Sequence, residues 1–410
     1  MSNAPVSYLP TLPVELLHRI LDNLDALTII SSLRLTCRRL KSIVDNYDRY
    51  RLDFRDVSKS NFQLLCRLID PRRVIALVLA PRPETTDEIE LFTTYFRARQ
   101  FKRLRSLDLI NIKQRQLKNL FKRFDCSSLV SFSFTLGQED CRCKNTTTAL
   151  LSSITAQKNL RYLDMDVSFY DADQIIWSTQ CAIKYLKLKG SQPLNEIFTI
   201  LRCSLHLRVL DIELFGSVHD IMPLTSYSSM SFPQVISLTL SKMYGTIDNL
   251  ELFILLMPSL NHLKIVSSKN FIHDNRWEQF IQANLPQLNR FELFIKDYNS
   301  RNTPVDLKSI LAPFQTPFWI EHKKWFFTCE YSTTKPAYFI LYSHPICVSS
   351  IDYIPESNKT SLSTLDPALN NNASSMNNVN TIQVSFEKFT MHDINQSLEV
   401  TIYHKFLLCI

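Results

Sequence analysis

The sequence predicts an α/β protein that has a bundle of three short helices, then a curved parallel sheet with helices on its outer side, then a β-rich cap. Three observations predict this order. Amphipathic helical patterns occupy the first 55 residues. After them, an apolar phrase of the form Leu-x-x-Leu-x-Leu returns about every 27 residues. Beyond residue 301 this period stops, and aromatic, β-favouring runs replace it.

The N-terminal patterns carry the start signals and the apolar spacing of short helices. Pro13 suits a first helical turn, where its missing N–H costs nothing. The apolar stripe of this helix, at three- and four-residue steps, comprises Leu17, Ile20, Leu21 and Leu24. We expect Thr28 to cap a second helix over 29–35 and Thr36 to cap a third that runs through Tyr47. A unit of about forty residues buries little surface, so we expect it to be stabilised by packing against a neighbouring domain or a partner protein.

A specific motif runs through these helices. Its residues are Leu12, Pro13, Glu15, Leu17, Ile20, Leu21, Leu24, Leu33, Leu35, Cys37, Arg38, Arg39 and Leu40. The motif resembles the F-box family, in which the Leu-Pro start and the apolar stripe insert into a Skp-type adaptor that attaches the protein to a cullin–RING ubiquitin ligase. The chain departs from the family at Leu40, where Trp or Phe is frequent, and at Thr36, where Val is frequent. The alternative is that 12–52 only forms a helical cap on the next domain.

The resemblance implies which residues would contact the adaptor. The implied adaptor-binding residues are Leu12, Pro13, Glu15, Leu17, Ile20, Leu21, Leu24, Leu33, Leu35 and Leu40.

The returning apolar phrase predicts a stack of strand–helix units. Its fourth position falls at Leu77, Leu107, Phe132, Leu163, Leu186, Leu210, Leu238, Leu263 and Phe291, at steps of 23 to 31 residues. This period is similar to that of leucine-rich repeats, in which each copy gives one strand of a parallel sheet and a returning helix. Helical patterns between the phrases lie at 116–121, 148–154, 195–201, 247–257 and 277–285.

The copies are irregular, because most lack the Asn or Cys that turns the chain after the strand and the whole protein has only four Gly. An ordinary α/β domain with a parallel sheet remains the alternative. If the solenoid is right, residues flanking the inward-pointing pair of each strand face its concave side, where a target protein would bind. The candidates are Tyr162, Asp164, Tyr185, Lys187, Asp211, His262, Lys264, Arg290 and Glu292. This mixture suits a protein or peptide more than a nucleic acid, although each residue alone could be an ordinary solvated position.

The chain is expected to have five segments. They are an F-box-like helical domain over 1–55, a repeat solenoid over 56–300, a β-rich capping segment over 301–356, a flexible Ser- and Asn-rich loop over 357–380 and C-terminal strands over 381–410. In the capping segment, the aromatic runs 318–328 and 337–342 predict a hairpin or two neighbouring strands. We expect the terminal strands to cover the open end of the solenoid.

Catalytic, cofactor and metal motifs are missing from the sequence, which indicates a protein that is not an enzyme and holds no cofactor or metal. Ten Cys occur, and the one cluster, Cys126, Cys141 and Cys143, has no His at a ligand spacing, so free thiols are expected. Without a signal-peptide pattern or an apolar run long enough to span a bilayer, we expect a cytoplasmic or nuclear location and no membrane partner.

The sequence therefore favours a substrate-recognition subunit of an SCF-type ubiquitin ligase. Its partners would be a Skp-type adaptor, through it a cullin–RING assembly, and an unknown target protein. The alternative is a nucleic-acid-binding protein or a scaffold without ligase attachment. Net charge is +7, and the basic stretch 97–123 with interleaved aromatics is the best support for nucleic acid. A solvated outer face with its aromatics in the core explains the stretch better, so a nucleic-acid partner is not expected.

Overall fold

The computed structural model describes most of the chain between residues 9 and 403. The described residues are 9–55, 57–80, 88–121, 127–137, 144–166, 175–179, 181–190, 194–213, 230–242, 247–267, 276–298, 305–332, 338–352, 359–365, 381–387 and 397–403. They form two compact units, each described by itself: 1–190 with 195–207, and 191–194 with 208–410.

The first unit begins with the helices η1 (Leu9–Thr11), α1 (Val14–Leu21), α2 (Ala26–Thr28), η2 (Ile29–Leu33), α3 (Arg34–Thr36) and α4 (Arg38–Asn46). Two predicted caps were wrong. Asp25, not Thr28, caps the second helix, because its carboxylate accepts a hydrogen bond from the Thr28 backbone N–H at 2.8 Å. Cys37, not Thr36, precedes α4, and its Sγ accepts from the Leu40 N–H at 3.5 Å.

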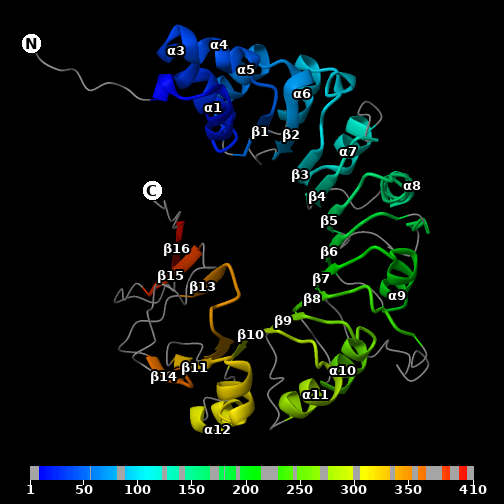
Figure 1. The fold of residues 1–410 in the computed structure, drawn as a ribbon, viewed down its shortest axis with the longest axis vertical. Helices are drawn as coiled ribbons and strands as arrows, with labels where there is room; N and C mark the ends of the chain where they lie inside the picture. Colours follow the sequence, from blue (N-terminus) through cyan, green and yellow to red (C-terminus); the bar gives the residue numbers. More distant parts are fainter. Residues whose placement is uncertain are drawn as a thin grey trace, which may run out of the picture. The chain divides into compact units, whose positions relative to one another are not determined.

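A parallel sheet follows the helices of the first unit. Its strands are β1 (Tyr50–Asp53), β2 (Val74–Leu79), β3 (Ser106–Ile112), β4 (Ser131–Leu136), β5 (Tyr162–Asp166) and β6 (Tyr185–Lys189), paired in that order. The helices between them are α5 (Lys59–Leu68), η3 (Pro71–Arg73), α6 (Glu88–Tyr95), η4 (Ala98–Gln100), α7 (Gln114–Phe121) and α8 (Lys144–Thr155), and most of α9 (Leu194–Cys203) also belongs to this unit. Figure 1 shows α5, α6 and α7 on one side of the strands β1 to β4.

The core of the first unit lies between the sheet and its helices. Alternate strand residues such as Leu107 and Leu109 are at most 1% exposed, as a period of two requires. Aromatic side chains fill the space beneath α5 and α6, where the Phe54 and Phe62 rings lie 4.6 Å apart between centroids. The predicted strand–helix alternation is confirmed in this unit, whereas strand β1 was not predicted.

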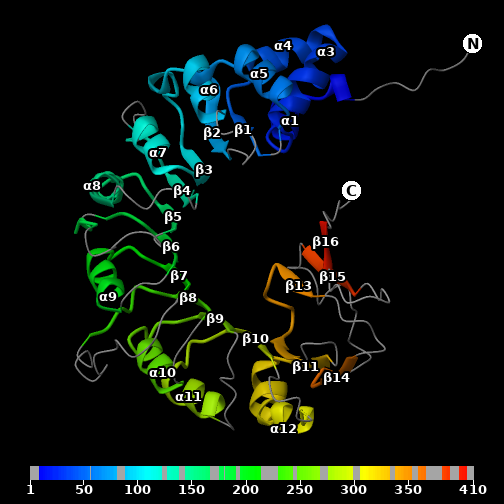
Figure 2. The same cartoon turned by 180° about the vertical axis from the view of Figure 1, so that it is seen from behind.

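The second unit continues the same alternation and then changes it. Parallel strands β7 (Val209–Glu213), β8 (Ser237–Ser241), β9 (His262–Ser267) and β10 (Arg290–Tyr298) are separated by the helices α10 (Ile247–Leu255) and α11 (Arg276–Asn284). Seen from behind in Figure 2, α10 and α11 lie on one side of β8 and β9. Strands β12 (Tyr338–Ser343), β11 (Phe327–Ser332) and β14 (Lys359–Ser363) then add to β10 in antiparallel order.

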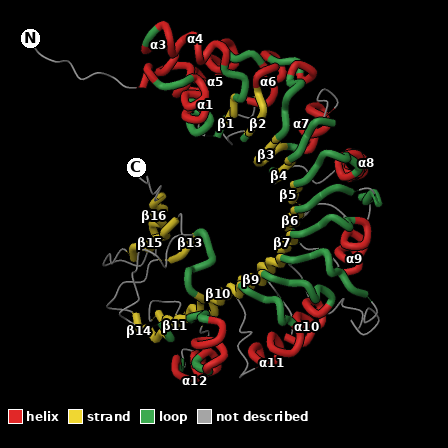
Figure 3. The backbone as a smooth tube through the Cα atoms, viewed as in Figure 1, coloured by secondary structure: helices red, strands yellow, loops and turns green. Residues whose placement is uncertain are grey.

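The remaining elements of the second unit surround this antiparallel part. They are α12 (Leu307–Leu311), η8 (Ala312–Phe314), η9 (Phe318–Lys323) and a second sheet of β13 (Ser350–Asp352), β15 (Thr381–Glu387) and β16 (Ser397–Tyr403). Figure 3 shows the helical turns at α12 and the strands that follow them. Both predicted terminal strands, at 381–386 and 398–403, are confirmed.

The predicted pair of neighbouring strands is confirmed, because β11 and β12 pair in antiparallel order, although β11 covers only the end of the run 318–328. Two other details of the prediction for the C-terminal part were wrong. The run 318–323 is helical, because Trp319 is buried against Phe314 and Phe327 and its Nε1–H donates to the Pro313 carbonyl at 3.0 Å. The segment 357–380, expected to be a flexible loop, contains strand β14, and its residues 357–358 and 366–380 lie outside the described residues.

Candidate docking surface

The N-terminal helices expose large apolar side chains that their own core does not use. Val14 and Leu16 in α1 are each 43% exposed, and Leu35 in α3 is 78% exposed. These side chains leave apolar area in water, which disfavours an isolated helical unit and favours a partner.

The predicted adaptor-binding residues fall into three classes of exposure. Leu17, Leu21 and Leu40 are at most 4% exposed, so they form the core of these helices and would support a partner's site rather than touch the partner. Half-buried positions are Leu12, Ile20, Leu24 and Leu33, and exposed ones are Pro13, Glu15 and Leu35.

Sequence reasoning missed Val14 and Leu16. The available signal was their place beside the apolar stripe of α1. Residues three or four apart share a helix face, which puts Leu16 next to Ile20 and Val14 next to Leu17 and His18.

Polar contacts hold the start and the end of these helices together. The Arg39 guanidinium donates to the Leu12 backbone carbonyl at 2.9 Å, which fixes the segment before α1 on α4. The buried Tyr47 hydroxyl donates to Asp22 Oδ1 at 2.7 Å. Asp22 also pairs with Arg49 at 3.2 Å. These contacts therefore hold together the helices that carry the exposed apolar residues.

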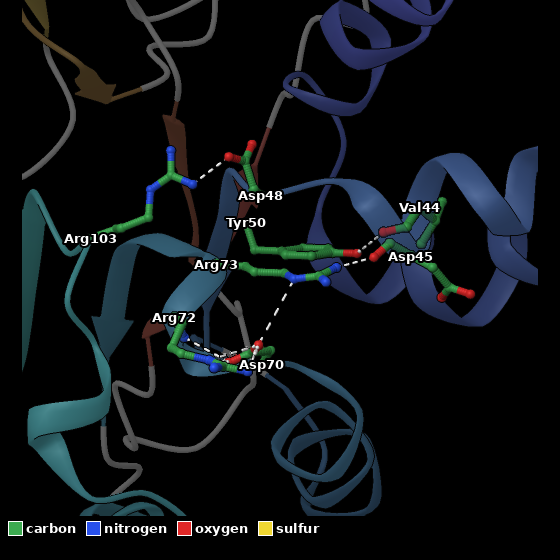
Figure 4. A network of polar contacts seen from close by, with 8 residues as sticks. All are labelled: Val44, Asp45, Asp48, Tyr50, Asp70, Arg72, Arg73 and Arg103. Atoms are coloured by element: carbon green, nitrogen blue, oxygen red, sulfur yellow. Dashed lines mark hydrogen bonds and ion pairs between the residues drawn. The ribbon is translucent and has the colours of Figure 1, made fainter.

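The helices are also attached to the sheet of the same unit (Figure 4). The Tyr50 hydroxyl at the start of β1 donates to the Val44 carbonyl at 3.0 Å. Arg73, just before β2, donates to the Asp45 carbonyl, and Arg103 pairs with Asp48. Because β1 is a strand of the sheet, these contacts attach the N-terminal helices to the sheet of the first unit.

In the first unit, the predicted target-binding residues lie together on β5 and β6. Tyr162 and Tyr185 are register partners whose rings stack at 4.5 Å between centroids and 13° between planes. Asp164 pairs with Lys189 at 3.1 Å and lies opposite Lys187. On the same face, burial raises the pKa of Asp108. Stacked aromatics beside charged groups form a face of mixed polarity.

In the second unit, the predicted residues form a second polar row. His262 lies between Ser237 Oγ at 3.0 Å and Glu292 Oε2 at 3.2 Å, and Arg290 Nε donates to Glu292 Oε1 at 2.7 Å. Burial alone would raise the pKa of Glu292, but the hydrogen bonds from His262 and Arg290 lower it below its ordinary value.

The chain itself covers part of this second row. Lys264 lies on β9 and is the register partner of Thr239 on β8 and of Glu292 on β10. Its Nζ donates to the Cys347 carbonyl. Around it Phe294, Tyr338, Ile340 and Ile346 form a buried apolar cluster with Cys347. Lys264 is therefore engaged by its own chain, whereas Asp211, two strands away, is half-buried.

Other candidate features can be placed as well. In the basic stretch 97–123, Phe101 is 3% exposed, and Phe96, just before the stretch, is 5% exposed, so neither ring is available for stacking on bases. Cys126, Cys141 and Cys143 lie outside the described residues. Within the described ranges, no group of three or more His, Cys, Asp or Glu side chains could hold a metal ion. None of the helices described is long and apolar enough to cross a bilayer.

Comparison with known protein families gives a match for the N-terminal helices. Residues 9–52 match the family model of the F-box domain. No curated protein matches the chain. The matched range begins at η1 and ends in β1, so it contains all of the exposed apolar residues described above.

Proposed function

We propose that the protein is the substrate-recognition subunit of an SCF-type cullin–RING ubiquitin ligase, binding a Skp-type adaptor through its F-box domain. The observation that carries this proposal is the F-box match over 9–52 together with exposed Val14, Leu16 and Leu35 in the same range. Burial of these side chains on an adaptor would stabilise the complex by about 25 cal/mol for each Å² of apolar surface removed from water.

We further propose that the strand–helix copies are irregular leucine-rich repeats and that their open strand face binds the target protein. The parallel pairing of successive strands supports a repeat architecture. The Tyr162–Tyr185 stack is the best candidate for a target contact, because Tyr combines a large apolar area with few rotatable bonds. In this proposal the chain performs no catalysis, works in the cytoplasm or nucleus and leaves ubiquitin transfer to the enzymes that the cullin recruits.

Co-purification of the full chain with a Skp-type adaptor tests the docking role. The test variant is Val14→Glu, Leu16→Glu, Leu35→Glu, which changes only exposed positions of the F-box domain. The matched control is Leu64→Glu, Leu68→Glu, which changes the exposed apolar side chains of α5 outside the matched range.

Stoichiometric capture by the intact chain and by the control, lost in the test variant, is the expected result. Absence of capture by the intact chain would overturn the ligase proposal. Equal capture by all three proteins would place the contact elsewhere on the chain.

A further inference from the structure

A groove of about 950 Å³ opens in the first unit between η3, the end of α6 and the turn η4. Its lining includes four cations, Arg72, Arg97, Arg99 and Lys102, and one carboxylate, Asp70. The groove lies outside the F-box match and away from the stacked tyrosines, so neither proposed role uses it.

The single carboxylate of the groove is already neutralised. Arg72 binds Asp70 through two parallel contacts, Nε to Oδ1 at 3.0 Å and Nη2 to Oδ2 at 2.9 Å, and its backbone N–H donates to Oδ1 at 3.0 Å. Figure 4 shows this pair beside Arg73. The hydrogen bond from Arg72 lowers the pKa of Asp70, which stays charged and paired. Because a guanidinium has five N–H donors, Arg72 is held in place with donors to spare.

The other three cations have no acidic partner among the residues that the structure describes. Arg97, Arg99 and Lys102 are exposed, and across the described ranges none of them forms an ion pair. Their backbone is fixed, since the Arg97 N–H donates to Gln100 Oε1 at 2.9 Å and the Gln100 N–H returns to the Arg97 carbonyl at 2.9 Å. Gln100 itself lines the groove, and its side-chain amide nitrogen is a further donor.

The rings next to these cations form the core below the groove. Phe96 and Phe101 pack edge to face at 5.4 Å between centroids and are at most 5% exposed. A single-stranded nucleic acid needs exposed rings on which its bases stack, and this groove offers none. Cations and amide donors without stacking rings fit a compact anion instead.

We propose that this groove binds a phosphate monoester, carried by a phosphorylated serine or threonine of a protein or present as a free phosphate compound. A monoester carries close to two negative charges at neutral pH and three acceptor oxygens, which match the three exposed cations Arg97, Arg99 and Lys102 and the spare donors of Arg72. This inference does not rest on the ligase role, because no F-box residue takes part in it.

The test measures retention of a degenerate peptide library with a fixed central phosphoserine by the full-length protein, against the same library with serine. We expect at least tenfold stronger retention of the phosphorylated library. The groove variant Arg97→Gln, Arg99→Gln, Lys102→Gln should lose that preference, with an unchanged melting temperature. The matched control, Lys59→Gln, Lys118→Gln, Lys158→Gln, removes three exposed cations of the same unit outside the groove and should keep it.

Two further arms separate the sources of the anion. If inorganic phosphate and pyrophosphate raise the melting temperature of the intact protein and the control but not of the groove variant, while no peptide is retained, the groove takes a free phosphate compound and the proposal stands. Equal behaviour of the groove variant and the control in both arms would overturn it. Binding of a 20-nucleotide RNA that the groove variant loses, with no response to phosphopeptide or phosphate, would overturn it in favour of a nucleic acid.

Discussion

The Tyr47 hydroxyl donates a hydrogen bond to Asp22 at 2.7 Å and so joins the residue after α4 to the residue after α1. Tyr47 is 1% exposed, and its ring packs edge to face on Tyr50 at 5.0 Å. One side chain therefore connects two helices of the F-box domain to the first strand of the sheet. We expect this connection to fix the position of the exposed apolar residues of α1.

Replacing Tyr47 with Phe should destabilise the first unit by about 1 kcal/mol, the usual net value of one hydrogen bond. The cost stays small because Asp22 keeps its pair with Arg49. Compared with the intact protein, the Tyr47→Phe variant should show a larger increase in amide hydrogen exchange in α1 than in the strands. Tyr95→Phe is the control, since the Tyr95 hydroxyl makes no hydrogen bond to any part of the chain that the structure describes. Equal exchange in both variants would contradict a bracing role for the hydroxyl.

Leu17 and Leu35 should respond in opposite ways to truncation. Leu17→Ala removes a side chain that is 3% exposed and should cost about 2–5 kcal/mol of folding stability. Leu35→Ala, at a side chain that is 78% exposed, should leave the melting temperature nearly unchanged and weaken adaptor capture. Melting curves and adaptor titrations of the two variants check this. A Leu35 variant that melts much earlier, or binds the adaptor normally, would exclude it from the contact surface.

The sequence was sufficient to predict every strand whose apolar residues alternate within the repeat. Leu210 and Ile212, for example, are both fully buried in β7, as their spacing requires. Alternation reports which side chains a core takes up, but it does not report what covers the other face. The contact between Lys264 and Cys347 joins residues 83 positions apart, and no local pattern predicts it.

The sequence could not distinguish between polar residues that compete for the same role. Thr28 and Thr36 were predicted as caps, yet the Thr28 hydroxyl donates to the Asp25 carboxylate and the Thr36 hydroxyl donates back to the Ser32 carbonyl at 3.0 Å. Within the F-box domain, apolar periodicity identified Leu17 and Leu21 but not their burial in the domain's own core. A periodic stripe fits a domain's own core and a partner's site equally well.

His344 should make the second unit less stable in mild acid. Its imidazole is half-buried, with Nε2 against Thr328 Oγ1 at 2.6 Å and a buried Nδ1 that has no hydrogen-bond partner in the described structure. Burial lowers the pKa of His344 below its ordinary 6.5. The unfolded chain therefore binds a proton at this imidazole near pH 6.5, whereas the folded chain binds it only at lower pH. The contribution of neutral His344 to the free energy of unfolding is full above pH 6.5 and is lost as the pH falls below it.

Denaturant unfolding at stepwise lower pH measures this effect. His344→Gln should unfold with a weaker dependence on pH below 6.5 than the intact protein, whereas His322→Gln, at an exposed position, should match the intact protein. Identical slopes for the intact protein and His344→Gln would show that another group is responsible.

Lys264 should hold the segment around Cys347 against the strand face of β9 and β10. Its ammonium donates to the Cys347 carbonyl, and hydrogen bonds with a charged partner contribute about 1.5–3 kcal/mol. Lys264→Met keeps much of the apolar stem but removes the donor, so amide exchange at 346–351 should rise by about 10- to 100-fold if local opening governs it. Lys308→Met, at an exposed position of α12 in the same unit, should leave this exchange unchanged. If the segment exchanges equally slowly in both variants, the apolar cluster of Phe294, Tyr338 and Ile346 holds it without the lysine.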